Sequence, residues 1–177
     1  MLDESDVATL VQAYLRPDPR HPEPGKRLHE LGPAVVPALA TAYESAGRWQ
    51  DRAALVVAAT FHARASDAAV ALGLKALGDR ATVVRYRACG LLAYANRPDT
   101  LPALRAALAH PDARTSADAA AAIVAIETGN HHRFIDRAGV GNITWNVNAA
   151  DGPAPERPRA GEIRAWWGRL RRRLSGR

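Results

Sequence analysis

Three alanine-rich runs decide the fold of this chain: residues 52–59 read RAALVVAA, residues 87–94 read RACGLLAY, and residues 117–124 read ADAAAAIV. Aligned on these runs, the copies are offset by 35 and 30 residues, and each is followed, after a break, by a second short apolar run. Self-similarity at this period is typical of stacked helical hairpins, because one hairpin cannot bury its apolar face alone. We therefore predict an all-α protein: an α-solenoid of about four hairpins stacked in a right-handed superhelix.

Helical spacing and chain-breaking residues place the hairpins around these runs. An N-terminal cap helix ends near Leu15 and is followed by a proline-rich linker over 17–25. A first short hairpin then pairs about 26–31 with 33–43. The second pairs 49–65 with 67–77, the third pairs 82–95 with 100–109, and a fourth copy begins near Arg114 and ends at Glu127. The second helix of that last copy is missing.

Two stretches of this pattern resemble a known family. Residues 28–39, LHELGPAVVPAL, and residues 98–112, PDTLPALRAALAHPD, are similar to the HEAT repeats of bacterial proteins. The similarity is greatest to the short HEAT-like repeats first described in phycobilisome lyases, and it covers about residues 25–130. Proteins of this type include scaffolds, regulatory subunits, lyase-associated proteins and DNA glycosylases. The resemblance therefore implies a fold and leaves the function open, and it transfers no catalytic residue to this chain.

Residues 129–148 break the repeat at the place of the missing helix. Ile143, Trp145 and Val147 alternate with polar residues, which is the period of a β-strand, and Phe134 and Ile135 could form the opposite strand. We predict that a small β-hairpin over 129–148 caps the exposed end of the solenoid.

The same segment also has functional interpretations. In one, it contacts a partner protein through His132, Arg137, Trp145 and Asn146. In another, His131, His132 and Asp136 bind a metal ion, but adjacent histidines in a strand or turn point apart. We therefore predict no metal site, and we expect Asp136 and Arg137 to make local hydrogen bonds or an ion pair.

The C-terminal segment 156–177 holds all of the excess positive charge. It contains 8 arginines and 2 glutamates, whereas residues 1–155 contain 16 basic and 16 acidic residues. We predict a domain over 1–155 and a separate amphipathic helix over 156–177, with Trp166 and Trp167 on its apolar face and Arg169 and Arg172 on its basic face. This helix could pack on the solenoid, bind an acidic partner or nucleic acid, or lie on an anionic membrane surface.

Arginines recur where the first helices of the hairpins begin, namely Arg52, Arg85, Arg87 and Arg114. We predict that they form a ladder of surface ion pairs with loop aspartates. The alternative is a polar stripe that recognises an acidic ligand.

No catalytic constellation is evident, and the single cysteine, Cys89, is expected to be a buried apolar residue. The acidic N-terminus lacks the pattern of a signal peptide, so we expect a cytoplasmic, bacterial protein. We predict a non-catalytic protein-binding module without a cofactor or a small-molecule substrate, acting as an adaptor, scaffold, regulatory subunit or immunity protein. Its surface would combine the second helices of the repeats with residues 129–148. The alternatives are a nucleic-acid-associated protein and a peripheral membrane-surface binder, both acting through 156–177.

Overall fold

The computed structural model describes residues 4–16, 18, 23–141 and 143–151. Helices account for most of them, and they begin and end close to the predicted positions. The elements in chain order are α1 (Glu4–Leu15), α2 (Pro24–Glu30), η1 (Gly32–Val35), α3 (Val36–Ser45), α4 (Trp49–Thr60), α5 (Asp67–Ala76), α6 (Thr82–Ala95), η2 (Pro98–Thr100), α7 (Leu101–Ala107), α8 (Ala113–Glu127), η3 (His131–Phe134) and η4 (Ala149–Asp151), where η marks a 3₁₀-helix.

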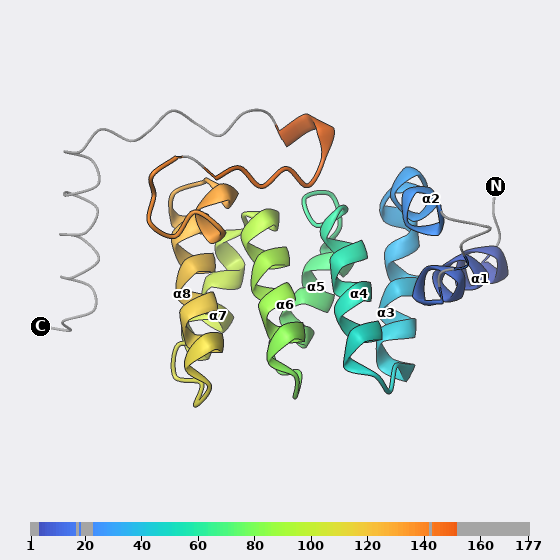
Figure 1. Ribbon diagram of the computed structural model, residues 1–177, viewed down its shortest axis with the longest axis horizontal. Coiled ribbons are helices and arrows are strands. Elements are labelled where there is room, and N and C mark those ends of the chain that lie inside the picture. The colour runs from blue at the N-terminus through green and yellow to red at the C-terminus, as the bar shows by residue number, and fades with distance from the viewer. Residues whose placement is uncertain (1–3, 17, 19–22, 142, 152–177) are drawn as a thin grey trace, which may run out of the picture.

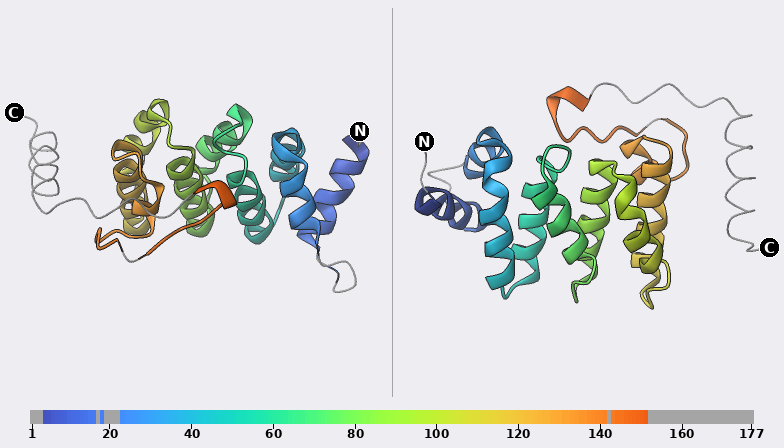
Figure 2. Two further views of the ribbon diagram at one scale, coloured as in Figure 1. Left: turned by 90° about the horizontal axis from the view of Figure 1, so that it is seen from above. Right: turned by 180° about the vertical axis from the view of Figure 1, so that it is seen from behind.

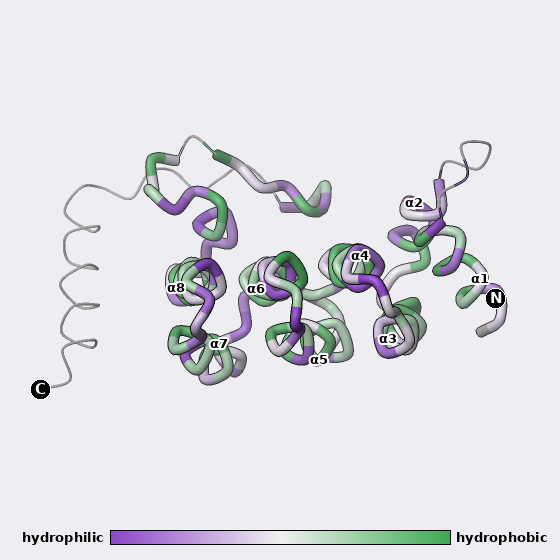
Figure 3. The backbone as a smooth tube through the Cα atoms, turned by 60° about the horizontal axis from the view of Figure 1, so that its bottom comes forward, coloured by the Kyte–Doolittle hydropathy of each residue, from purple (hydrophilic) through white to green (hydrophobic). Residues whose placement is uncertain are grey.

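The helices form two parallel rows, as expected for a helical repeat. First helices α4, α6 and α8 stand side by side in one row, and second helices α3, α5 and α7 form the other (Figure 3). Helix α1 packs against α2 and α3 at the N-terminal end of the stack (Figure 1). Local signals set the boundaries: the Ser66 hydroxyl accepts a hydrogen bond from the Ala69 N–H at the start of α5. Asn96 ends α6 in the left-handed conformation, with φ of 55°.

Small residues let the two rows approach closely. Gly73 on α5 lies so near α6 that an added Cβ would stand 2.6 Å from the Leu91 side chain. Alanines such as Ala59, Ala88 and Ala122 are fully buried between the helices. The alanine-rich runs are therefore the contact surfaces of the stack, which explains how a chain with few aromatic residues builds a continuous core.

The β-hairpin predicted over 129–148 is wrong. Residues His131–Phe134 form the 3₁₀-helix η3, and none of the described residues that follow pairs as a strand. Side chains take the backbone groups that a strand ladder would use: the Trp145 N–H donates to His132 Nδ1, and the Val147 and Asn148 N–H groups donate to Asp151. An alternating pattern therefore gave the false signal of a strand.

Residues 135–141 and 143–151, which we call the strap, follow η3 and run back along the row of first helices toward α4 (Figures 1 and 2). They replace the second helix of the fourth copy. The predicted C-terminal helix over 156–177 lies outside the described residues. None of the helices within the described ranges has the length and apolar character needed to cross a membrane.

Candidate functional site

Arginines of the first helices form ion pairs with aspartates of the following loops, and we call this series the Arg–Asp ladder. The Arg52 guanidinium contacts Asp79 twice, with Nε–Oδ2 and Nη2–Oδ1 distances of 2.6 and 3.0 Å. Arg85 contacts Asp112 at 2.6 Å, and both pairs span 27 residues. The side chains of Arg52 and Asp79 are only 8% and 5% exposed. The ladder therefore begins inside the molecule, and the prediction of surface ion pairs is wrong for this rung.

The rungs are connected to one another. Arg85 Nη1 donates to the Asp79 carbonyl oxygen at 2.6 Å, so the loop that contains Asp79 is held by arginines of two successive first helices. Burial alone raises the pKa of the Asp79 carboxyl, but hydrogen bonds from Arg52 and from neighbouring N–H and O–H groups outweigh it and lower this pKa to about 2. The Asp79 carboxylate is thus charged, and its hydrogen bonds are made to groups of the fold itself.

The ladder also corrects the register of the repeat. Arg52 and Arg85 each donate to the carbonyl oxygen six residues earlier, so these two residues are equivalent, and Arg87 is not the counterpart of Arg52. In the last copy the equivalent position holds Asp118, which accepts from Arg137 at 2.5 Å. The ladder therefore ends in a pair of reversed polarity.

The end of the strap is fastened by a network around Asp151, whose side chain is only 1% exposed. Its carboxylate accepts from Arg64 Nη1 at 2.9 Å, from the Tyr94 hydroxyl at 2.8 Å, and from two strap N–H groups. Burial alone raises the pKa of Asp151, but these hydrogen bonds outweigh it and hold the pKa below its usual value. Asn148 adds a bond from its side-chain amide to the Phe61 carbonyl oxygen at 2.9 Å.

Two adjacent histidines of η3 hold the middle of the strap through the Trp145 backbone. The rings of His131 and His132 lie 4.0 Å apart, because η3 places them side by side instead of pointing them apart. His131 Nε2 lies 2.9 Å from the Trp145 carbonyl oxygen, and Arg64 Nη2 lies 3.1 Å from its Nδ1. Burial lowers the pKa of His131, with a contribution from Arg64 in the same direction. Both partners fit a neutral ring that donates from Nε2.

A groove opens between the strap and the first helices. Its deeper part is a pocket of about 150 Å³ between α4, α6 and the strap, lined mainly by aromatic and aliphatic side chains. Gly90 makes the room: an added Cβ would lie 3.1 Å from the Phe134 ring and 3.4 Å from the Trp145 ring. Tyr86 stacks on Phe134 with 5.4 Å between ring centres. The lining is Val57, Thr60, Phe61, Tyr86, Arg87, Gly90, Leu91, Phe134, Ile135, Trp145, Asn146 and Val147.

A second pocket continues the groove toward the N-terminal end. It has a volume of about 380 Å³, and Val57 and Phe61 line both pockets. The remaining lining comes from α1, α2 and α4: Tyr14, Gly25, Lys26, Leu28, His29 and Ala58. We call the two pockets together the strap groove.

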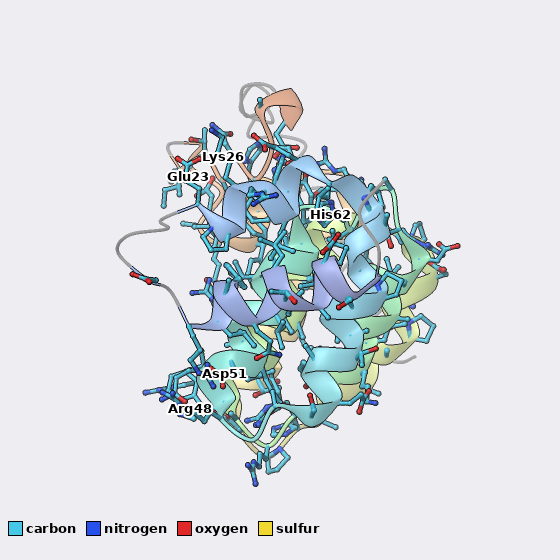
Figure 4. All side chains as sticks on the ribbon, turned by 90° about the vertical axis from the view of Figure 1, so that its right-hand side faces the viewer. Glu23, Lys26, Arg48, Asp51 and His62 are labelled. Atoms are coloured by element: carbon cyan, nitrogen blue, oxygen red, sulfur yellow. The ribbon has the colours of Figure 1, made fainter. Side chains whose placement is uncertain are left out.

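His62 follows α4 beside this groove. Figure 4 shows Asp51 and His62 toward opposite ends of α4. The His62 ring is 6.1 Å from that of His29, and its buried Nε2 has no hydrogen-bond partner among the described residues. Burial and then the charge of His29 lower the pKa of His62. The ring is therefore held neutral.

The repeat suggested by the geometry agrees with comparison to known families. Residues 70–136 match the family model of HEAT repeats, from within α5 to the beginning of the strap. Residues 70–136 are therefore HEAT repeats. Neither a curated protein nor a solved structure matches it significantly. The narrower resemblance to the repeats of phycobilisome lyases stays a prediction.

The HEAT-repeat stack and strap separate the predicted contact residues into three groups. Trp145 and Asn146 line the strap groove. His132 and Arg137 have internal partners, since His132 accepts from the Trp145 N–H and Arg137 bonds to Asp118. Those of the tail lie outside the described residues: Trp166, Trp167, Arg169 and Arg172. On α6, the groove residue Tyr86 was missed, whereas Arg87 was named only in the alternative of a polar stripe that recognises an acidic ligand.

The fold itself uses the residues that were considered for metal or redox chemistry. Asp136 accepts from the Val140 and Gly141 N–H groups and does not pair with Arg137. Within the described ranges, no three His, Cys, Asp or Glu side chains are grouped as metal ligands. Burial, followed by the charge of Asp118, raises the pKa of the Cys89 thiol to about 12. Cys89 is thus a thiol at neutral pH, as expected for a buried apolar residue.

Proposed function

We propose that this chain is a non-catalytic protein-binding module that receives its partner in the strap groove. HEAT repeats generally mediate protein–protein interactions, because a stack of helices offers a long continuous surface. The observation that supports this site is the groove itself, an opening lined by aromatic residues from three separate parts of the chain. Aromatic and arginine side chains of this kind are the usual anchors of protein interfaces.

The proposed surface differs from the one expected from the sequence. The sequence combined the second helices with residues 129–148, but the strap contacts first helices and the turns that follow them, through Phe61, Gly90 and Tyr94. On the side of the first helices, predicted contact residues of the strap therefore lie next to a pocket. We place the partner there and leave adaptor, scaffold, regulatory or immunity activity as narrower predictions.

Site-specific photo-crosslinking in cells that naturally express the chain tests this function. A benzophenone amino acid is introduced at Asn146 in the groove, and a matched variant carries it at Leu74 on α5, which is 37% exposed on the second-helix row. We expect a discrete protein adduct from position 146 and none from position 74. Adducts from position 74 alone would show that the partner binds on the second helices, as the sequence predicted. The absence of an adduct at both positions would contradict the proposed function.

The alternatives that depend on 156–177 stay predictions from the sequence. Binding to nucleic acid would be steeply salt-dependent, because it would rest on contacts between arginine and phosphate. Titration of full-length protein with duplex DNA, and with vesicles containing anionic lipid, tests both ideas. A charge-reversed variant at Arg171, Arg172 and Arg173 is the control, and equal binding by the two proteins would reject them.

A further inference from the structure

Arg87 has no arginine counterpart in the neighbouring copies of the repeat. In the register set by the ladder it occupies the place of Ala54 and Ala120 in the neighbouring copies. Arg52 and Arg85 have carboxylate partners, whereas the described residues provide no carboxylate within ion-pair distance of Arg87. Its guanidinium is exposed and lies 5.3 Å from the centre of the Tyr86 ring.

Arg87 also places a positive charge at the strap groove. It lines the deeper pocket directly. Its charge acts on Tyr14 in the second pocket, where burial raises the pKa of the hydroxyl and Arg87 opposes this rise. The linings of the two pockets contain no aspartate or glutamate. Lys26 is already paired with Glu23 and Glu30, so Arg87 dominates the charge of the strap groove.

The deeper pocket has the size and chemistry for one side chain. A cavity of about 150 Å³ lined mainly by aromatic and aliphatic side chains has room for a six-membered aromatic ring. Phe61, Tyr86, Phe134 and Trp145 offer ring faces and edges to such a guest. An apolar anchor in this pocket would leave its neighbouring residues close to Arg87.

We propose that the strap groove binds an acidic, extended segment of a partner protein. One aromatic or large aliphatic side chain enters the pocket between α4 and α6, and a carboxylate next to it pairs with Arg87. This inference rests on the proposed protein-binding function and names the chemistry of the partner. An ion pair beside aromatic walls is screened less than one on an open surface, so Arg87 selects for the acidic residue.

Charge favours an acidic peptide over two other occupants of the strap groove, the chain's own C-terminal segment and a nucleic acid. The chain's own segment 156–177 has 8 arginines against 2 glutamates, so Arg87 repels it. A nucleic acid binds through many phosphate contacts, whereas the groove lining contains a single unpaired arginine and otherwise mainly apolar groups. An acidic peptide with an apolar anchor is complementary to both features.

Selection from a phage library of random dodecapeptides on immobilised full-length protein tests the inference. We expect the enriched peptides to have a net negative charge and an aromatic or large aliphatic residue beside an acidic one. The affinity of the best peptide is then measured by fluorescence anisotropy. Arg87→Glu should weaken it by about tenfold or more, and replacing the acidic residue of the peptide by lysine should restore binding to that variant.

Arg114→Glu is the matched control, because Arg114 is an exposed arginine on α8 that does not line the groove. It should leave the affinity unchanged, and circular dichroism should show both variants folded. Basic, neutral or no enriched peptides, or equal effects of the two variants, would overturn the inference. An adduct from position 146 together with such a result would leave the proposed function standing and reject only the acidic partner.

Discussion

The Arg–Asp ladder and the strap both use buried charges, but they use them differently. In the ladder one contact is repeated with the same 27-residue spacing, and each rung joins consecutive copies of the repeat. In the strap, Asp151 gathers donors from Arg64, Tyr94 and its own segment, and no other part of the described chain repeats this arrangement. Repetition therefore builds the stack, whereas unique contacts attach the strap that frames the groove.

Breaking a rung of the ladder should have the largest effect. Arg52→Met leaves the buried Asp79 carboxylate without its cation, so we expect the free energy of unfolding to fall by about 3 kcal/mol. Urea denaturation followed by circular dichroism measures this. The double variant with Asp79→Asn should recover part of the loss, because it removes the unpaired charge. A loss below about 1 kcal/mol would show that the rung contributes no more than a surface pair.

Loosening the strap should have a smaller and local effect. Asp151→Asn weakens the bonds to Arg64 and to the strap N–H groups, so we expect the Val147 and Asn148 amides to exchange hydrogen about tenfold faster. Amide exchange followed by NMR measures this. Amides in the middle of α6 serve as the internal control and should keep their rates. Faster exchange throughout α6 would mean that strap and stack open together.

Acid should lower the free energy of unfolding through His131, the neutral histidine of η3 that contacts the strap. The pKa of His131 is lowered in the folded protein, so the unfolded chain takes up a proton first as the pH falls below about 6.5. Stability should therefore decline from that pH downward until the folded protein is protonated as well. We expect His131→Gln to show a smaller decline between pH 7 and pH 5.5 in urea unfolding. Parallel curves for the two proteins would exclude His131 as a source of this dependence.

The smallest effect is expected for an ion pair outside both networks. Arg105 Nη2 contacts Glu127 at 3.0 Å, but the arginine side chain is 51% exposed. Arg105→Met should lower the free energy of unfolding by less than about 1 kcal/mol, and added salt should reduce the difference further. A loss as large as that of Arg52→Met would show that burial does not distinguish ladder rungs from surface pairs.

The helices of the stack could be predicted because the physical signals repeat. Alanine-rich runs, Ser66 as a cap and Asn96 in a turn each act within a few residues, and the pattern recurs along the chain. The register could not be settled in the same way. Arg85 and Arg87 both resemble Arg52 in sequence, and only the contact with the loop aspartate tells them apart.

The strap could not be predicted because its contacts are distant in sequence. Arg64 and Asp151 are 87 residues apart, and no local sequence pattern near either residue indicates that they pair. The alternation of Ile143, Trp145 and Val147 suggested a strand, but side chains from η3 and η4 take the backbone groups. Trp145 and Asn146, which were singled out because they interrupt the repeat, line the groove, and their contact with a partner stays a prediction.

The reversed pair at the last copy gives the stack a direction and a terminus. A further repeat would present a loop carboxylate to position 118, where the ladder would need a cation and finds Asp118 already bonded to Arg137. Two carboxylates would then meet in a poorly hydrated place, which is unfavourable. The order of charges along the chain thus allows copies to stack on one another up to α8. The last charged position is then neutralised by an arginine of the chain itself.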